Sequence, residues 1–98
     1  MMTTMKFKLG RILSTPGALE VLRESGQAAV EFLDRHIQGD WGDVSKADAF
    51  LNEEALIDGS RIMSEYQTAN KTRLWVITEA ADDNGHRIAT TILLPEEY

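Results

Sequence analysis

The chain has 98 residues, a mass of 11.0 kDa and a net charge of −6, and it contains no cysteine. This length predicts one domain over residues 1–98, and the lack of cysteine excludes disulfides, thiolate catalysis and cysteine-ligated metals. No apolar run approaches the roughly 20 residues of a membrane span, and the N-terminus has no hydrophobic signal core. We therefore expect a cytoplasmic protein that does not enter a membrane.

The negative charge is unevenly distributed along the chain. Residues 1–19 carry three basic side chains and no acidic one, whereas residues 20–58 carry ten acids and three bases, a net charge of −7. Because a negative surface repels phosphate backbones, we expect no binding to nucleic acid. The acidic middle of the chain is either a solvated surface or a surface that docks on a basic partner.

A short strand or extended arm is predicted at residues 7–14, where apolar and polar residues alternate at first. Thr15 and Pro16 then predict a helix start, because threonine caps a helix and proline suits its first position. Gly26 ends that helix. A second helix is predicted from residue 27 or 28 to residue 38, because apolar residues recur there at three- and four-residue spacing.

Residues 40–43 form a tight loop in which Trp41 lies between glycines. Two interpretations of this tryptophan stay open: it is a lid that closes the helical layer, or an exposed anchor for a partner. Ser45 caps a third helix, which Gly59 ends. The apolar side of this helix consists of Ala47, Phe50, Leu51, Ala55 and Ile57.

The last 40 residues are rich in β-branched and aromatic side chains and predict three strands. These are residues 61–68, 73–79 and 87–94. Asn84-Gly85, between the last two strands, is a strong hairpin signal. The predicted fold class is therefore α+β, with an N-terminal arm or strand, three short helices and a C-terminal three-stranded antiparallel β-meander.

The second predicted strand carries apolar side chains on both faces, with Leu74 and Val76 on one face and Trp75 and Ile77 on the other. A half-solvated sheet would show cleaner alternation. We therefore expect the second face to be covered by the N-terminal segment, by the Trp41 loop or by another subunit.

The sequence contains no recognisable catalytic or cofactor motif. His36 and His86 are fifty residues apart; the first lies near a helix C-terminus, where a protonated ring is favoured, and the second lies beside a turn. No serine lies in a nucleophile-elbow motif, and no phosphate-binding glycine loop, calcium loop or zinc spacing occurs. We therefore expect no enzymatic activity, no cofactor and no metal.

Seven residues are candidates for contact with a partner. Tryptophan, tyrosine and arginine dominate binding hot spots, and exposed turns and loops carry function more often than cores do. The candidates are Trp41, Asp40, Asp43, Trp75, Tyr66, His86 and Arg87.

Five stretches carry a resemblance to known proteins. They are residues 7–12 (FKLGRI), 15–20 (TPGALE), 39–42 (GDWG), 74–80 (LWVITEA) and 90–98 (TTILLPEEY). In this order they resemble a small bacterial family carried on plasmids and integrative elements, whose members are labelled plasmid-related proteins and sometimes type I restriction methylase subunit M. The sequence gives the methylase label no support, because it has no Gly-rich cofactor loop. The resemblance implies a setting on mobile DNA in a bacterial cytoplasm, and it carries over no site residue.

Three functional hypotheses follow. The first is a non-enzymatic accessory protein of a mobile genetic element, which binds another protein or forms a homodimer. The second is an acidic anti-defence inhibitor of restriction or CRISPR nucleases, which mimics DNA or occupies a nucleic-acid-binding groove. The third is a small hydrolase or transferase centred on Asp40, Asp43 and His86.

Overall fold

Local capping signals set the helix boundaries in the computed structural model, which describes residues 5–98. The Thr15 hydroxyl accepts a hydrogen bond from the Ala18 amide at 3.2 Å, and the Ser45 hydroxyl accepts one from the Asp48 amide at 3.1 Å. Each bond satisfies an amide of the first helical turn that has no partner within the helix. The three predicted helices are confirmed as α1 (Pro16–Ser25), α2 (Ala29–Ile37) and α3 (Lys46–Asp58).

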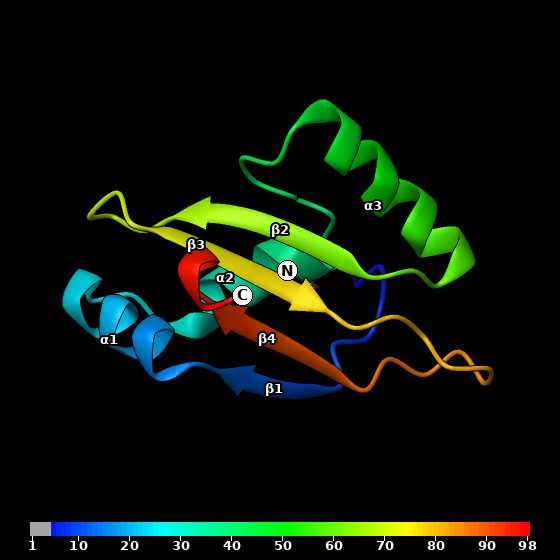
Figure 1. Cartoon of the computed structure of the whole chain (residues 1–98), viewed down its shortest axis with the longest axis horizontal. Coiled ribbons are helices and arrows are strands. Elements are labelled where there is room, and N and C mark those ends of the chain that lie inside the picture. The colour runs from blue at the N-terminus through cyan, green and yellow to red at the C-terminus, as the bar shows by residue number, and fades with distance from the viewer. Residues whose placement is uncertain (1–4) are drawn as a thin grey trace.

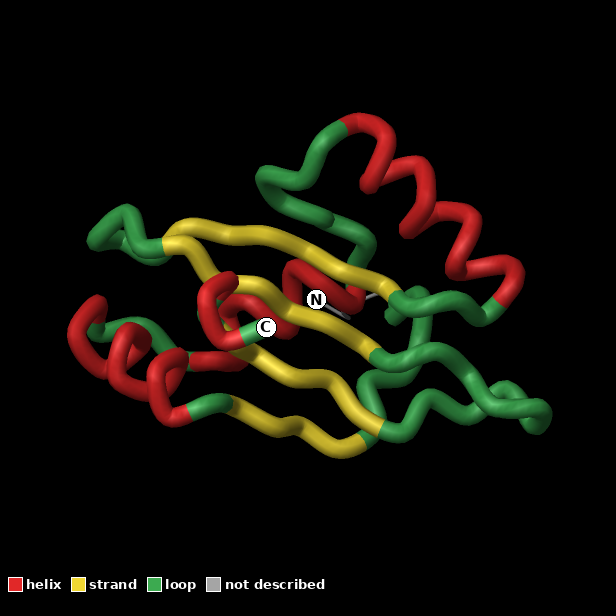
Figure 2. Tube along the Cα trace, viewed as in Figure 1, coloured by secondary structure: helices red, strands yellow, loops and turns green. Residues whose placement is uncertain are grey.

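The sheet has four strands in the spatial order β1-β4-β3-β2 (Figures 1 and 2). The strands are β1 (Arg11–Ser14), β2 (Ile62–Gln67), β3 (Arg73–Thr78) and β4 (Ala89–Leu93). β2, β3 and β4 pair in antiparallel fashion, as the meander predicts, but β1 pairs with β4 in parallel. The predicted α+β class is confirmed, whereas the three-stranded antiparallel sheet is corrected to a mixed sheet of four strands.

Gly10 allows the N-terminal arm to join the sheet. Its φ is +66°, and a Cβ atom at this position would overlap the carbonyl oxygen of Arg87. Beyond this close approach the Arg11 amide donates to the Ile88 carbonyl at 3.0 Å, which starts the parallel ladder. The alternating pattern of the arm predicts a strand, but such a pattern does not specify which distant strand is its partner.

Helices α1 and α2 pack on one face of the sheet, here named the back face because α2 lies behind the strands in Figure 1. Their apolar sides and the inward side chains of the strands form the main core. Burying each large apolar side chain contributes about 1.5–3 kcal/mol to folding. The core residues are Ala18, Leu22, Phe32, Leu33, Tyr66, Leu74, Val76 and Ile92.

Helix α3 lies beside β2, at one edge of the sheet (Figure 1). The side-chain amide of Asn52 pairs with this edge: it donates to the Met63 carbonyl at 2.7 Å and accepts from the Met63 amide at 3.1 Å. Further along the edge, the Glu65 amide donates to the Trp41 carbonyl and the Asp43 amide donates to the Glu65 carbonyl. These contacts satisfy backbone groups of β2 that an open edge would offer to another strand.

The predicted apolar side of α3 is largely exposed, which corrects the sequence-based expectation. The helix buries Asn52 and Ala55, while Phe50, Leu51 and Ile57 are 62%, 60% and 86% exposed. The physical reason is the edge of β2, where backbone donors and acceptors require a polar side chain. The helix therefore turns Asn52 toward the sheet and keeps Leu56 packed against the cluster of Trp41, Ala55 and Ile62, while Phe50, Leu51 and Ile57 stay exposed.

The opposite face of the sheet, here named the front face, is covered by the C-terminal residues of the same chain. A 3₁₀ turn, η1 (Pro95–Glu97), lies in front of the strands in Figure 1. The Tyr98 ring packs edge-on against Trp75, with ring centroids 5.6 Å apart, and Ile77 and Leu93 are buried. In the part of the chain that the structure describes, these C-terminal residues cover part of the front face. Neither the described residues of the N-terminal segment nor the Trp41 loop covers it, which corrects two of the three expected coverings.

Candidate functional site

A chain of polar side chains runs through the core without reaching solvent. His36 Nδ1 lies 2.6 Å from Ser64 Oγ, and His36 Nε2 lies 2.8 Å from Thr78 Oγ1. Thr78 Oγ1 is 2.7 Å from the hydroxyl of Thr90, which donates to the Leu9 carbonyl. All four side chains are buried, and neither His36 nor Ser64 is accessible to a substrate in this arrangement.

Burial lowers the pKa of His36 to about 4, with a further lowering by the positive charge of Arg87. The ring is therefore neutral at pH 7, and each of its nitrogens forms a hydrogen bond with a hydroxyl group. The expectation of a protonated histidine that stabilises a helix C-terminus is wrong, because α2 turns this side chain into the core rather than toward solvent.

The Trp41 loop is held in place by internal contacts. Trp41 is 7% exposed, stacks on the Phe7 ring at 6.2 Å between centroids, and donates from its indole nitrogen to Glu53 at 2.8 Å. The Tyr66 hydroxyl donates to the Asp40 carbonyl at 2.6 Å, and burial raises the pKa of Tyr66. Neither aromatic ring is free for a partner, so the loop matches the lid interpretation.

The two carboxylates of this loop have different surroundings. Asp40 accepts a hydrogen bond from Arg35 Nε at 2.6 Å and another from the Gly42 amide at 3.1 Å. The bond to Arg35, above all, lowers the pKa of Asp40. Asp43 is exposed, and its backbone amide is bound to the β2 edge. Asp40 therefore closes the loop on α2. Of these two carboxylates, only that of Asp43 is exposed without a hydrogen bond to another described residue.

Trp75 is the candidate that retains access to solvent on the front face. Its ring is half-buried, and its indole nitrogen donates to Glu65 at 2.9 Å. The adjacent Tyr98 is 70% exposed, and the Arg61 guanidinium lies 5.4 Å above the Tyr98 ring. The front face thus presents a small aromatic cluster of Trp75 and Tyr98. Glu65 contacts the first ring and Arg61 contacts the second.

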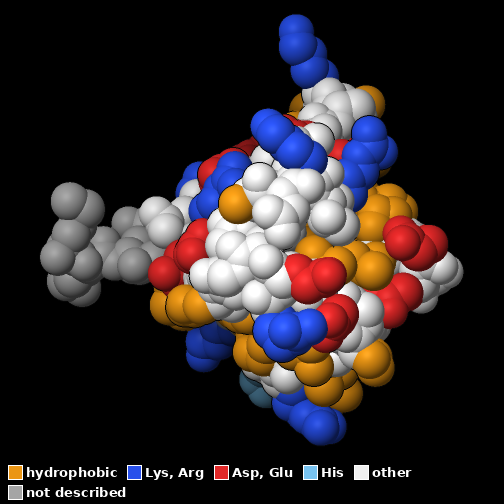
Figure 3. All heavy atoms as spheres, turned by 90° about the vertical axis from the view of Figure 1, so that its left-hand side faces the viewer, with side chains coloured by type: hydrophobic (Ala, Val, Ile, Leu, Met, Phe, Trp, Pro, Cys, Tyr) orange, Lys and Arg blue, Asp and Glu red, His pale blue; other side chains and the backbone are white. Residues whose placement is uncertain are grey.

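Helix α3 carries three exposed large apolar side chains, whereas α1 and α2 each carry one. Phe50 and Ile57 lie seven residues apart and so share one side of the helix, here named its outer face, whereas Leu51 lies on an adjoining side beside Asp48 and Met63; all three are more than half exposed. The helix carries four acids and one lysine over Lys46–Asp58, a net charge of −3. By contrast, at the end of the molecule that carries α1, hydrophobic patches alternate with both acidic and basic side chains (Figure 3).

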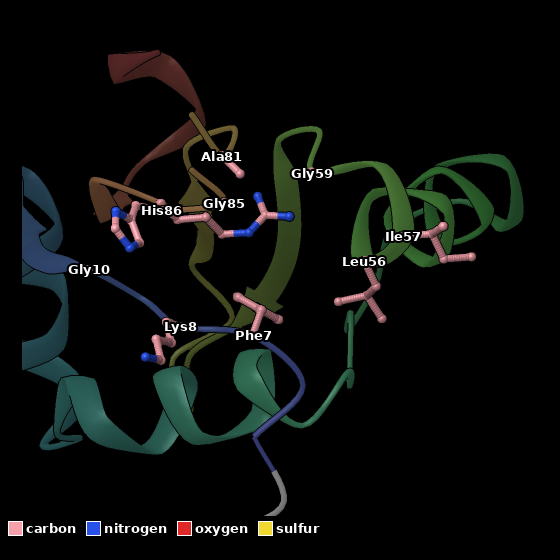
Figure 4. A pocket seen from close by; sticks show the side chains of 10 residues that line it. Phe7, Lys8, Gly10, Leu56, Ile57, Gly59, Ala81, Gly85 and His86 are labelled. Atoms are coloured by element: carbon pink, nitrogen blue, oxygen red, sulfur yellow. The ribbon is translucent and has the colours of Figure 1, made fainter. Parts of the chain in front are cut away.

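A cleft of about 600 Å³ opens where β3 ends and β4 begins (Figure 4). Side chains and backbone from the N-terminal arm, from the end of α3 and from the β3–β4 connection line it. The lining residues are Phe7, Lys8, Gly10, Leu56, Ile57, Gly59, Ala81, Gly85, His86 and Arg87. His86 is exposed at the turn, whereas Arg87 is half-buried.

Arg87 ties three backbone segments together. Its guanidinium donates to the carbonyls of Ser60, Glu79 and Ala55 at 2.8, 3.0 and 3.0 Å. The last of these carbonyls belongs to the C-terminal turn of α3, where a cation is favoured by the helix dipole. Burial lowers the pKa of Arg87, while the charge of nearby Asp58 opposes this effect.

The residues of the hydrolase hypothesis do not meet at this cleft. Asp40 and Asp43 are not among its lining residues, although His86 is. The carboxylate close to His86 is that of Asp82, which accepts hydrogen bonds from the backbone amides of Asn84 and His86 and so shapes the turn. Within residues 5–98 no cluster of three or more His, Asp or Glu side chains is arranged to hold a metal ion.

Among the described helices, none is long and apolar enough to cross a membrane. Comparisons with protein-family models, with curated proteins and with solved structures found no significant match. Sequence reasoning missed the outer face of α3, and it missed the cleft as a cavity although it named His86 and Arg87, which line it. Asn52, a polar residue in the middle of an apolar helical stripe, is the sequence signal that could have revealed the first.

Proposed function

We propose that this chain is a non-enzymatic binding protein that docks the outer face of α3 on another protein, whose contact segment is apolar and flanked by basic residues. The observation that carries the proposal is the exposure of Phe50 and Ile57 on the side of α3 opposite the sheet edge, with Leu51 exposed on an adjoining side. Large apolar side chains grouped on an exposed face are typical of interaction surfaces. The mobile-element setting implied by the resemblance belongs to this proposal as its cellular context.

Burial of this face supplies useful binding energy. Each large apolar side chain contributes about 1.5–3 kcal/mol when it moves from full exposure to full burial. Phe50, Leu51 and Ile57 retain more than half of their exposure, so their combined contribution is roughly 3–6 kcal/mol before the cost of association. This amount supports a specific complex when charge complementarity is added.

The charge of α3 favours a basic partner over a second copy of this chain. Two such helices packed antiparallel across a two-fold axis would place Phe50 of each near Ile57 of the other, and Glu54 near its own symmetry mate. Each helix also carries a net charge of −3, so self-association would bring like charges together. A helix with lysine or arginine beside its apolar side chains would instead place its positive charges near Glu54, which is exposed four residues after Phe50.

Site-specific photocrosslinking in bacterial cells tests this function. A benzophenone amino acid replaces Phe50 in one variant and Val30 in the control, because Val30 is also an exposed apolar side chain, on α2. We expect a discrete adduct from position 50 alone, with the crosslinked peptide of the partner containing basic residues. A dimer of this chain at position 50, no adduct at all, or equal adducts from both positions would refute the proposal.

An acidic inhibitor that mimics DNA is the second candidate, favoured by the net charge of −7 over residues 20–58. Mimicry needs carboxylates that are free to replace phosphates, yet Asp40 is bound by Arg35 and Glu53 by Trp41. We therefore rank it below docking through α3. Reversing the charge of Asp43 and Glu54 would abolish nuclease inhibition if mimicry is the function.

A further inference from the structure

We infer that the cleft at the end of the sheet binds a small amphipathic organic anion, a medium-chain or aryl carboxylate with one charged head and an apolar body. The cleft volume of about 600 Å³ falls within the range of roughly 300–1,000 Å³ that is typical of small-molecule sites. This site would bind a small molecule, whereas the outer face of α3 would bind a protein, although Ile57 borders both surfaces.

The ionisable side chains that line the cleft are all basic, in a chain whose net charge is −6. They are Lys8, His86 and Arg87, and no carboxylate is among the lining residues. Among residues 5–98, Arg87 forms no ion pair; its hydrogen bonds go to neutral carbonyls. The charge of its guanidinium is therefore not neutralised by direct contact, and an anion is the complementary ligand.

Arg87 also removes a feature that would repel an anion. The C-terminal end of α3 points its last carbonyl groups toward this region, and free carbonyls there would carry negative potential. The guanidinium binds the Ala55 carbonyl, and the Gly59 amide also donates to that carbonyl, at 2.9 Å. The Ala81 amide in turn donates to the Gly59 carbonyl at 2.7 Å.

The lining is polarised along the cleft. In Figure 4, Lys8 and His86 lie toward one side, Leu56 and Ile57 lie toward the other, and Phe7 lies between them. The Phe7 ring is held by its stacking on Trp41, so it offers a fixed apolar wall. A carboxylate head beside the Lys8 ammonium and the His86 ring would place an alkyl or aryl body along Phe7 toward the end of α3.

Titration of the ¹⁵N-labelled chain with decanoate, followed by amide NMR, tests the inference. Gly10, Gly59 and Gly85 line the cleft and report binding, whereas Gly26, at the end of α1, is the internal control. We expect saturable shifts of the three cleft glycines with Gly26 unmoved. Decanol, which has the same chain without charge, is expected to bind at least tenfold more weakly, and butyrate, which has the same head, is expected not to saturate.

The double variant Lys8→Gln and His86→Gln tests the head-group contacts, because both side chains are exposed and their loss leaves the core intact. We expect at least fivefold weaker decanoate binding, while the remote Lys71→Gln variant keeps the original affinity. Absence of saturable shifts, equal binding of decanol and decanoate, or an unchanged affinity of the double variant would overturn the inference. None of these readouts depends on a protein partner of α3.

Discussion

The buried imidazole of His36 predicts a pH dependence of stability in a range where few other groups titrate. The pKa of this ring is about 4 in the folded chain, against an ordinary value of 6.5. Because the folded pKa is the lower one, the unfolded chain binds a proton first as the pH falls. The stability that the neutral ring contributes is therefore complete above pH 6.5 and is lost as the pH falls toward 4.

The size of the effect follows from the two pKa values. A difference of about 2.5 pKa units corresponds to about 3 kcal/mol at most, of which about 2 kcal/mol falls between pH 7 and pH 5. The carboxylates whose pKa is lowered in the fold, such as Asp40 and Glu97, lose their contribution mainly below that range. The interval from pH 7 to pH 5 thus reports chiefly on His36.

Urea unfolding followed by tryptophan fluorescence at pH 7, 6 and 5 measures this loss. His36→Gln removes the titrating ring while keeping a side chain that can bond to Ser64 or Thr78, so its stability should change little over this range. His86→Gln, at an exposed turn, is the matched control and should keep the original slope. A free energy of unfolding that stays constant for the unmodified chain, or falls equally in His36→Gln, would refute the reasoning.

Three further predictions concern backbone strain and backbone hydrogen bonds, and equilibrium urea unfolding at pH 7 checks them. Gly42→Ala should cost at least 2 kcal/mol more than Gly26→Ala, because both have positive φ but only at Gly42 would a Cβ overlap the β2 strand, so equal losses would contradict the geometry. Asn52→Ala should cost about 1–3 kcal/mol because it leaves the Met63 amide and carbonyl without partners, and a neutral result would show that water replaces them. Lys71→Gly should raise stability by about 0.5–1 kcal/mol because the lysine has φ +68°, and a loss would contradict the strain argument.

The secondary structure could be predicted from sequence because its signals are local. Thr15 and Ser45 cap the first and third helices as their positions suggest, and glycines follow both helices. The strand ranges follow from the β-branched and aromatic composition of the last 40 residues. The parallel pairing of β1 with β4 could not be predicted, because it joins residues almost 80 positions apart and depends on the close approach at Gly10.

The candidate site was harder to predict because burial depends on what each element packs against. Trp41, Tyr66 and Arg87 are residue types that dominate binding surfaces, but here the loop, the core and the helix end each use one of them internally. For α3, the apolar stripe predicts a buried side, yet the edge of β2 selects Asn52 instead. The exposed stripe is therefore visible only when the helix is placed beside the sheet.

The most direct measurement of the central claim is the yield of the photocrosslinked adduct at position 50 after Glu54→Lys is introduced. Glu54 is an exposed acid on α3 near the apolar residues, so its reversal should leave the fold intact and repel a basic partner. We expect the adduct to fall to the background of the position 30 control while the free energy of unfolding changes by no more than about 0.5 kcal/mol. An undiminished adduct in a folded Glu54→Lys variant would contradict the claim that α3 recognises a basic segment of another protein.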